Sequence, residues 1–154
     1  MKALLCAALL GLAVAGCAKI EGKTRDLLAT SATSYAVLDG MLYEGTVTTN
    51  YGDRFGTLQF AAKAAQGQVC AGTMRYTASS SGSAMLQCTG GVEVMLSFTA
   101  LGASSGFGYG STVKGPASFT WGMSIQNANA YLRFPEGQVP IPEPPAKPWY
   151  QTLF

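Results

Sequence analysis

The chain has 154 residues, a formal net charge of +2 and no histidine. Only 12% of its residues are charged, 48% are hydrophobic, and 19 are glycine. A net charge this small supplies no strong field for nucleic acid or for an anionic membrane surface. The lack of histidine excludes Ser-His-Asp and Cys-His catalysis and also histidine-ligated zinc.

The first 16 residues have the order of a secretory signal peptide. Lys2 supplies a positive charge, and residues 3–15 form an uncharged run of Ala, Leu, Val, Gly and Cys. This run is shorter than the roughly 20 residues that cross a bilayer, and small residues end it, as at a signal cleavage site. A plain signal peptide, in which Cys17 has no role, is the simplest alternative.

Residues 12–17 read LAVAGC and resemble the lipobox of bacterial lipoproteins, which here comprises Val14-Ala15-Gly16-Cys17. The resemblance implies that Cys17 carries a diacylglycerol and a further acyl chain such as palmitate, and that cleavage makes it the first mature residue. Two or more acyl chains anchor a protein stably. Because Ala18 follows the cysteine, the resemblance also implies the outer membrane, on either its periplasmic or its outer face.

The remaining chain is expected to form one domain with two extensions. Removal of residues 1–16 leaves 138 of the 154 residues, which is the size of one domain. Residues 17–33 are polar and are predicted to be a lipidated tether. Alternating apolar residues predict an antiparallel β domain over 34–135, and a Pro-rich tail follows over 136–154.

The β domain is predicted to have eight or nine short strands and no long helix. Turn residues, such as Asp39-Gly40 and the serines and glycines near residues 79–82, separate the strands. The expected strands are 35–38, 41–49, 55–60, 68–77, 83–89, 92–100, 117–125 and 128–134, and a Gly-rich stretch at 102–110 forms a hairpin or a glycine-kinked strand. The pattern fits a small antiparallel β-barrel or a two-sheet β-sandwich, and both remain open.

The cleanest alternation in the chain lies in residues 117–125. Every second residue there is large and apolar, namely Phe119, Trp121, Met123 and Ile125. Successive side chains of a strand point to opposite faces. We therefore expect one face of this strand in the core, while the other is wet or contacts a partner.

The four cysteines predict one disulfide. Cys6 lies in the leader and Cys17 is the expected lipidation site, so Cys70 and Cys88 remain in the exported domain. Two thiols in an oxidising compartment are expected to pair. The chain has no C-x-x-C motif, so redox catalysis by these cysteines is not expected.

A strand register follows for these cysteines if the turn between their strands is centred on Ser79. Cys70 and Cys88 are then directly opposed, with Cα atoms about 4.5–5.5 Å apart, which a disulfide tolerates. A turn centred on residues 80–81 would instead require a bulge or a bridge between non-neighbouring strands. The first register also places inward residues opposite each other: Gly72 with Leu86, Met74 with Ala84, and Tyr76 with Gly82.

No pattern of catalytic or cofactor-binding residues stands out. The eight Asp and Glu residues are spread singly, without a close pair of the glycosidase type. The glycine-rich residues 106–112 lack the Gly-Lys-Ser/Thr ending of a phosphate-binding loop. We therefore expect no enzymatic activity, no cofactor and no metal.

The tail is the first candidate for partner binding. Five prolines in nine residues cannot donate ladder hydrogen bonds and favour polyproline II. Trp149, Tyr150, Leu153 and Phe154 follow them and are of the residue types that anchor interfaces. We expect these residues to bind a partner protein or a second copy; the alternative is that the tail wraps over its own domain.

Phe107 and Tyr109 share one face of the Gly-rich stretch and are a second candidate for partner binding. The leading hypothesis is a non-enzymatic outer-membrane lipoprotein that serves as a structural or assembly component of a cell-envelope complex through protein contacts. The alternative is a small periplasmic ligand-binding or enzyme-inhibitor lipoprotein. For that alternative, Cys70-x-Gly72-x-x-x-Tyr76 is similar to lysozyme-inhibitor lipoproteins, which are small lipid-tethered β-barrels with a disulfide.

Overall fold

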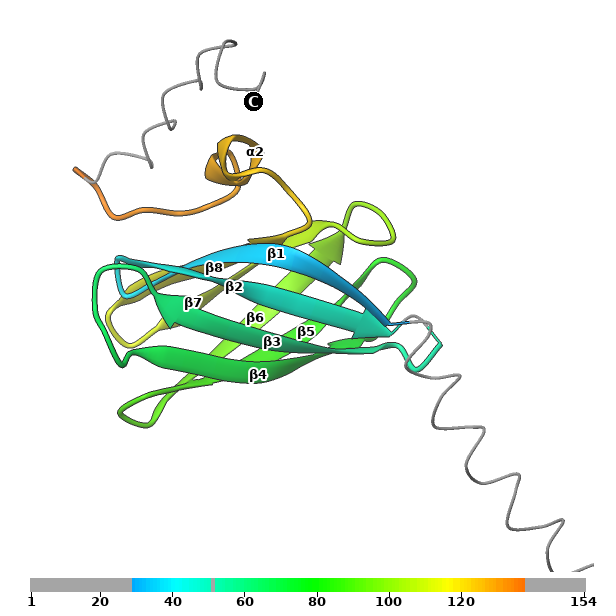
Figure 1. The fold of residues 1–154 in the computed structure, drawn as a ribbon, viewed down its shortest axis with the longest axis horizontal. Helices are drawn as coiled ribbons and strands as arrows, with labels where there is room; N and C mark the ends of the chain where they lie inside the picture. Colours follow the sequence, from blue (N-terminus) through cyan, green and yellow to red (C-terminus); the bar gives the residue numbers. More distant parts are fainter. Residues whose placement is uncertain (1–28, 51, 138–154) are drawn as a thin grey trace, which may run out of the picture.

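A closed barrel of eight antiparallel strands forms the domain in the computed structural model, which describes residues 29–50 and 52–137 (Figure 1). Consecutive strands pair with each other, and β1 pairs with β8 to close the barrel. The strands are β1 (Ala29–Leu38), β2 (Met41–Asn50), β3 (Phe55–Ala62), β4 (Val69–Tyr76), β5 (Ser81–Cys88), β6 (Val92–Ala100), β7 (Gly106–Thr112) and β8 (Gly115–Trp121). The fold is therefore a β-barrel and not the two-sheet β-sandwich that the sequence also allowed.

Every second residue of the strands points into the barrel, as the alternating pattern predicts. Val47, Leu58, Leu86 and Val94 have no exposed surface. Their burial stabilises the fold by about 1.5–3 kcal/mol for each large aliphatic side chain. Closure also removes the free strand edges that an open sheet would expose.

Tight turns join the strands at the positions that the sequence indicated. Asp39 and Gly40 connect β1 to β2 with φ angles of 51° and 76°. Two positive φ angles are typical of a type I′ turn, whose twist matches that of the flanking strands. Gly90 and Gly91 connect β5 to β6 with φ angles of 86° and 78°, where the lack of a Cβ atom removes the usual steric penalty.

The predicted disulfide and its register are confirmed. Cys70 of β4 lies opposite Cys88 of β5, and their sulfur atoms are bonded at 2.01 Å. The turn between the strands is therefore centred on Ser79. The other inward pairs are also those expected from the sequence: Gly72 with Leu86, Met74 with Ala84, and Tyr76 with Gly82.

Aromatic side chains fill one half of the barrel interior. The ring of Phe98 meets Tyr76 and Trp121 edge to face, with centroids 4.9 and 5.8 Å apart. Trp121 also stacks on Phe119 at 5.5 Å. The glycines of β7 make room for these rings, because a Cβ atom at Gly106 would lie 2.2 Å from the Trp121 ring. The Gly-rich stretch therefore leads into a glycine-rich strand, β7, and of the two forms expected for it the structure has the strand.

The predicted final strand at 128–134 is wrong, and the strand predicted at 117–125 ends at Trp121. Gly122 has a φ angle of +67° and turns the chain away from the sheet. Ser124 then caps the short helix α2 (Ile125–Asn129), since its side chain accepts a hydrogen bond from the Asn127 amide. Because β1 already pairs with β8, no barrel edge is left for a ninth strand.

Residues 122–137 form instead a strap on the outside of the barrel. Figure 1 shows α2 and the segment after it lying over β1. Ala128 and Leu132 of the strap pack on Val37, which points outward from β1, in a second apolar cluster. The outer face of β8 is therefore covered by the chain itself, and Ser118 and Thr120 are buried there.

The barrel begins earlier than the sequence suggested, since β1 starts at Ala29 within the expected tether. Residues 29–33 pair with residues 46–50 of β2, and the hydroxyls of Ser31 and Thr48 lie 2.8 Å apart. This part of β1 is mostly exposed at the end of the barrel. It therefore carries no apolar alternation from which a strand could be predicted.

Candidate functional site

The two ends of the barrel have different constructions. The tether end contains Ala29, where the described chain enters β1, and also Trp121, the last residue of β8. The mouth end contains Leu38 and the turns that follow β1, β3, β5 and β7. In an up-and-down barrel these two sets of turns lie at opposite ends, as Figure 1 shows.

A cavity of about 240 Å³ opens at the mouth end. Its apolar wall includes Leu38, Met41, Val92 and Val94, and Cys88 of the disulfide also borders it. Polar groups at its rim come from all four turns: Asp39, Gln68, Thr89, Thr112 and Lys114. The cavity thus combines apolar walls with a few convergent polar groups, as small binding sites do.

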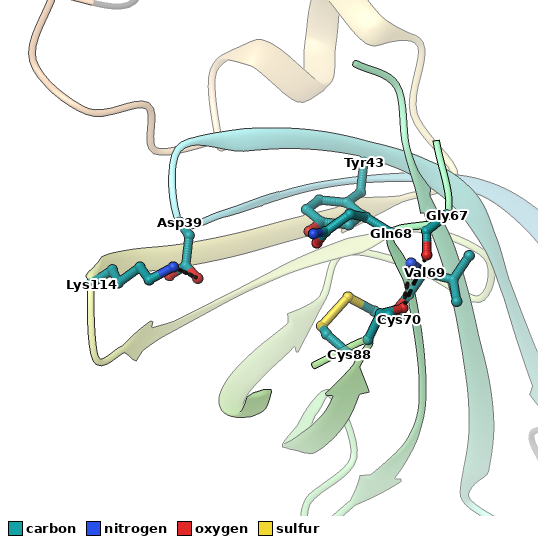
Figure 2. The surroundings of a disulfide bond; sticks show 9 residues. Asp39, Tyr43, Gly67, Gln68, Val69, Cys70, Cys88 and Lys114 are labelled. Atoms are coloured by element: carbon teal, nitrogen blue, oxygen red, sulfur yellow. Dashed lines mark hydrogen bonds and ion pairs between the residues drawn. A yellow bond between two sulfur atoms is a disulfide. The ribbon is translucent and has the colours of Figure 1, made fainter. Parts of the chain in front are cut away.

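Asp39 is the most buried charge at the rim, with 13% of its side chain exposed. The Thr112 hydroxyl donates a hydrogen bond to one of its carboxylate oxygens. The other oxygen lies 4.0 Å from the ammonium of Lys114, whose side chain is 71% exposed. Figure 2 shows these two side chains approaching each other from neighbouring turns. An ion pair this long and this exposed on one side contributes about 0–1 kcal/mol.

Tyr43 supplies a phenol inside the mouth and is 3% exposed. Its hydroxyl lies 3.4 Å from the Gln68 side-chain oxygen, and the two side chains lie together beside the disulfide in Figure 2. Burial raises the pKa of the Tyr43 phenol above its usual 10.0, and the Asp39 carboxylate raises it further. Tyr43 is therefore a neutral hydrogen-bonding group at neutral pH.

The disulfide and Thr89 hold the β4 and β5 side of the rim. The Thr89 hydroxyl accepts a hydrogen bond from the Val69 amide at 3.0 Å. It also lies 3.3 Å from the Gly67 carbonyl oxygen. With the Cys70–Cys88 bond, these contacts join the start of β4 to the end of β5 (Figure 2). The rim is therefore fixed by covalent and hydrogen bonds near the cavity.

Phe107 and Tyr109 share the outer face of β7, as the sequence indicated, and contact the strap. The Phe107 ring stacks on Tyr131 with centroids 4.6 Å apart. The guanidinium of Arg133 lies 4.0 Å from the centre of the Tyr109 ring, a cation–π contact. The strap therefore gives these two aromatic residues partners within their own chain.

The remaining predicted site residues lie outside the described residues. These are Cys17 in the expected lipobox and four residues of the tail: Trp149, Tyr150, Leu153 and Phe154. The lipid anchor and the tail site therefore stay predictions. The mouth cavity is the site that sequence reasoning missed, because its lining comes from four turns that only barrel closure brings together.

Other surface features carry less chemistry. A shallow hollow of about 400 Å³ lies on the outside of β2, β3 and β4, and its lining includes the small side chains of Ala61 and Ala71. Ser111 and Lys114 have the S-x-x-K spacing of Ser/Lys acyl-transfer enzymes, a motif missed in the sequence. Ser111 lies exposed on a strand, and Lys114 is paired with Asp39. Residues 29–50 and 52–137 contain no cluster of three metal-ligating side chains.

No protein-family model matches the chain, and neither a curated protein nor a solved structure matches it significantly. Among the described residues, no helix is long and apolar enough to cross a membrane. The N-terminal sequence and the geometry of the barrel are therefore the features that bear on function.

Proposed function

We propose that the protein is a non-enzymatic lipoprotein of the bacterial outer membrane that acts as a structural or assembly component of the cell envelope. Cys17 would be the lipid anchor. The mouth end of the barrel would contact another envelope protein. The observation that carries this proposal is the opposition of the two ends: the chain enters β1 at the tether end, and the cavity opens at the mouth end.

This arrangement suits an anchored binding protein. A lipid on Cys17 lies N-terminal to β1 and holds the tether end nearer to the bilayer. The mouth end then lies at the opposite end of the barrel from the attachment point, where another envelope protein can reach it. Val113, at the tip of the turn between β7 and β8, is 96% exposed. An aliphatic side chain presented in this way on a rim suits a protein contact.

A second candidate is a small ligand bound in the cavity, or the inhibition of an enzyme. The mouths of eight-stranded barrels hold single small ligands in other proteins. The polar groups at the rim of the mouth favour this reading. Its volume of about 240 Å³ disfavours it, because sites for drug-sized ligands enclose roughly 300–1,000 Å³. We therefore place the protein contact first.

Two experiments in the intact envelope test the proposal. Cys17→Ser should release the protein from the membrane fraction or leave it unprocessed, and unchanged fractionation would reject the anchor. A photo-crosslinking amino acid at Val113 should capture an envelope protein. The same amino acid at Ser79, an exposed residue in a tether-end turn, serves as the matched control. Capture from Ser79 but not from Val113 would reject the proposed contact.

A further inference from the structure

We infer that the mouth cavity receives one long basic side chain, a lysine or an arginine, from the partner protein. The inference deepens the proposed function and rests on it, since it names the chemistry of the partner at the same site. It follows from the size of the cavity, the apolar wall and the state of Asp39. These three observations are independent of the tether and the tail.

The size of the cavity limits its occupant. A volume of about 240 Å³ lies below the range of roughly 300–1,000 Å³ for drug-sized ligands. One side chain that enters from a partner surface is a better match. The interior behind the cavity is filled, because Val94 and Leu86 have no exposed surface. The occupant therefore cannot extend deeper into the barrel.

The wall of the cavity suits a long aliphatic stem. The half-buried side chains of Met41 and Val92 present only carbon and sulfur atoms to it, and the buried Leu38 and Val94 border it further. Lysine and arginine carry three or four methylene groups that pack on apolar surface while the charged head reaches a polar group. A short acidic side chain would leave this wall without contacts.

Asp39 supplies the polar group for the charged head. Its carboxylate is largely buried, and among the described residues it contacts only the Thr112 hydroxyl and the distant Lys114 ammonium. A carboxylate can accept about four hydrogen bonds, and a buried charge is costly unless it is paired. A basic head group that displaces the exposed Lys114 would give Asp39 a closer partner. Tyr43 and Gln68 add neutral oxygen atoms to the lining of the same cavity.

A second ion pair between a carboxylate and a lysine, near the same end of the barrel, provides a control. Glu44 lies 3.5 Å from Lys63, a closer contact than that of Asp39 with Lys114. Glu44 is exposed on the outside of β2 and does not line the mouth cavity. A carboxylate paired with lysine is thus present at both places, but only Asp39 faces an enclosed space.

The test is an NMR titration of the detergent-solubilised full-length protein with two peptides, acetyl-Gly-Lys-Gly-amide and its norleucine analogue. The lysine peptide should shift the amide signals of Gly90, Val92 and Thr112 with a Kd on the order of 1 mM. The norleucine peptide should bind about tenfold more weakly, because it keeps the stem and lacks the charge. Amides of the tether end, such as those of Ser79 and Gly82, should not shift.

Two substitutions at the mouth should act in opposite directions. Asp39→Asn should remove the preference for lysine while keeping the turn, because Asn also tolerates a positive φ angle. Lys114→Ala should tighten lysine-peptide binding by about two- to fivefold, since it removes a weak competitor for Asp39. Glu44→Gln should change nothing. Equal binding of the two peptides, or binding unaffected by Asp39→Asn, would overturn the inference.

The inference and the proposed function fail separately. If Val113 captures a partner equally well in the wild type and in Asp39→Asn, the basic side chain is the wrong assignment and the envelope contact stands. If the lysine peptide binds at Asp39 but Val113 captures nothing, the proposed function is wrong and the chemistry of the cavity stands.

Discussion

The tether end and the mouth end of the barrel differ in the side chains that fill them. The rings of Tyr76, Phe98 and Trp121 pack against one another at the tether end. At the mouth end, aliphatic side chains, the single ring of Tyr43 and a disulfide border a cavity of about 240 Å³. One end of this barrel is therefore stabilised by aromatic packing, while the other combines a covalent bond with a cavity.

Truncation of Trp121 should have the largest effect and would test whether aromatic packing holds the tether end. Trp121→Ala should lower the free energy of unfolding by about 3–5 kcal/mol, because it leaves a large cavity. Urea unfolding followed by circular dichroism measures the change. Met41→Ala at the half-buried rim of the mouth should cost only about 1 kcal/mol. Equal losses from the two substitutions would remove the distinction between the ends.

Trp121→Phe sharpens the same test. The Trp121 indole N–H is buried and has no hydrogen-bond partner among the described residues. The ring should therefore contribute through its packing, and Trp121→Phe should cost clearly less than Trp121→Ala. The same urea unfolding measures both variants. A loss as large as that of the alanine variant would show that a phenyl ring cannot replace the packing of the indole.

Removal of the disulfide is the corresponding test of the mouth end. The double substitution Cys70→Ala and Cys88→Ala should lower the free energy of unfolding by about 3 kcal/mol, as the chain-entropy model gives for a loop of this length. Urea unfolding again measures the loss. Thiol labelling of the denatured, unreduced wild type should find neither cysteine free. Labelling of both would show that the mouth end holds without a covalent bond.

The strap and the tail should differ in their effects on stability. Leu132→Ala should cost about 2 kcal/mol, because Leu132 is buried against the outside of β1. Truncation after Gly137 leaves every described contact in place and should cost less than about 0.5 kcal/mol. The same truncation should abolish co-purification with a partner if Trp149 and Tyr150 bind in trans. A large fall in melting temperature would show that the tail belongs to the domain's own core.

The smallest predicted effect concerns the Tyr43 phenol at the mouth. Asp39→Asn should lower the pKa of Tyr43, because it removes the negative charge that favours the neutral phenol. Burial still acts, so the pKa should stay above 10.0. Tyrosinate absorbance measured during an alkaline titration, with a Tyr43→Phe variant to identify the signal, reports the change. A pKa unaffected by Asp39→Asn would show that the two groups do not interact.

The sign of the linked stability follows from the same shift. The pKa of Tyr43 is higher in the folded protein than in the unfolded chain. The contribution of the neutral phenol to the free energy of unfolding is therefore fully present below pH 10. It is lost as the pH rises through the folded pKa. Tyr43→Phe should therefore weaken the dependence of stability on pH above 10. An unchanged alkaline dependence would contradict this account.

The barrel strands and the disulfide could be predicted because they depend on local patterns. Period-two alternation assigns a face to each residue of a strand, and the parity of Cys70 and Cys88 leaves one direct register for a turn centred on Ser79. The final strand could not be predicted in this way. Residues 128–134 contain apolar residues that suit a strand. A ninth strand would need a free strand edge, but β1 and β8 already pair with each other.

Sequence alone determined the class of fold, the cysteine pair, the Asp39-Gly40 turn and the expectation of a lipid anchor at Cys17, because each depends on neighbours along the chain or on one hairpin. Tertiary structure alone decided the closed barrel, the strap and the mouth cavity. Barrel closure is a pairing between the first and last strands, and the cavity needs four turns in one place. Long-range contacts of this kind leave no periodic trace in the chain, because the ladder hydrogen bonds join backbone N–H and C=O groups, which do not depend on the side chain except that proline lacks the N–H.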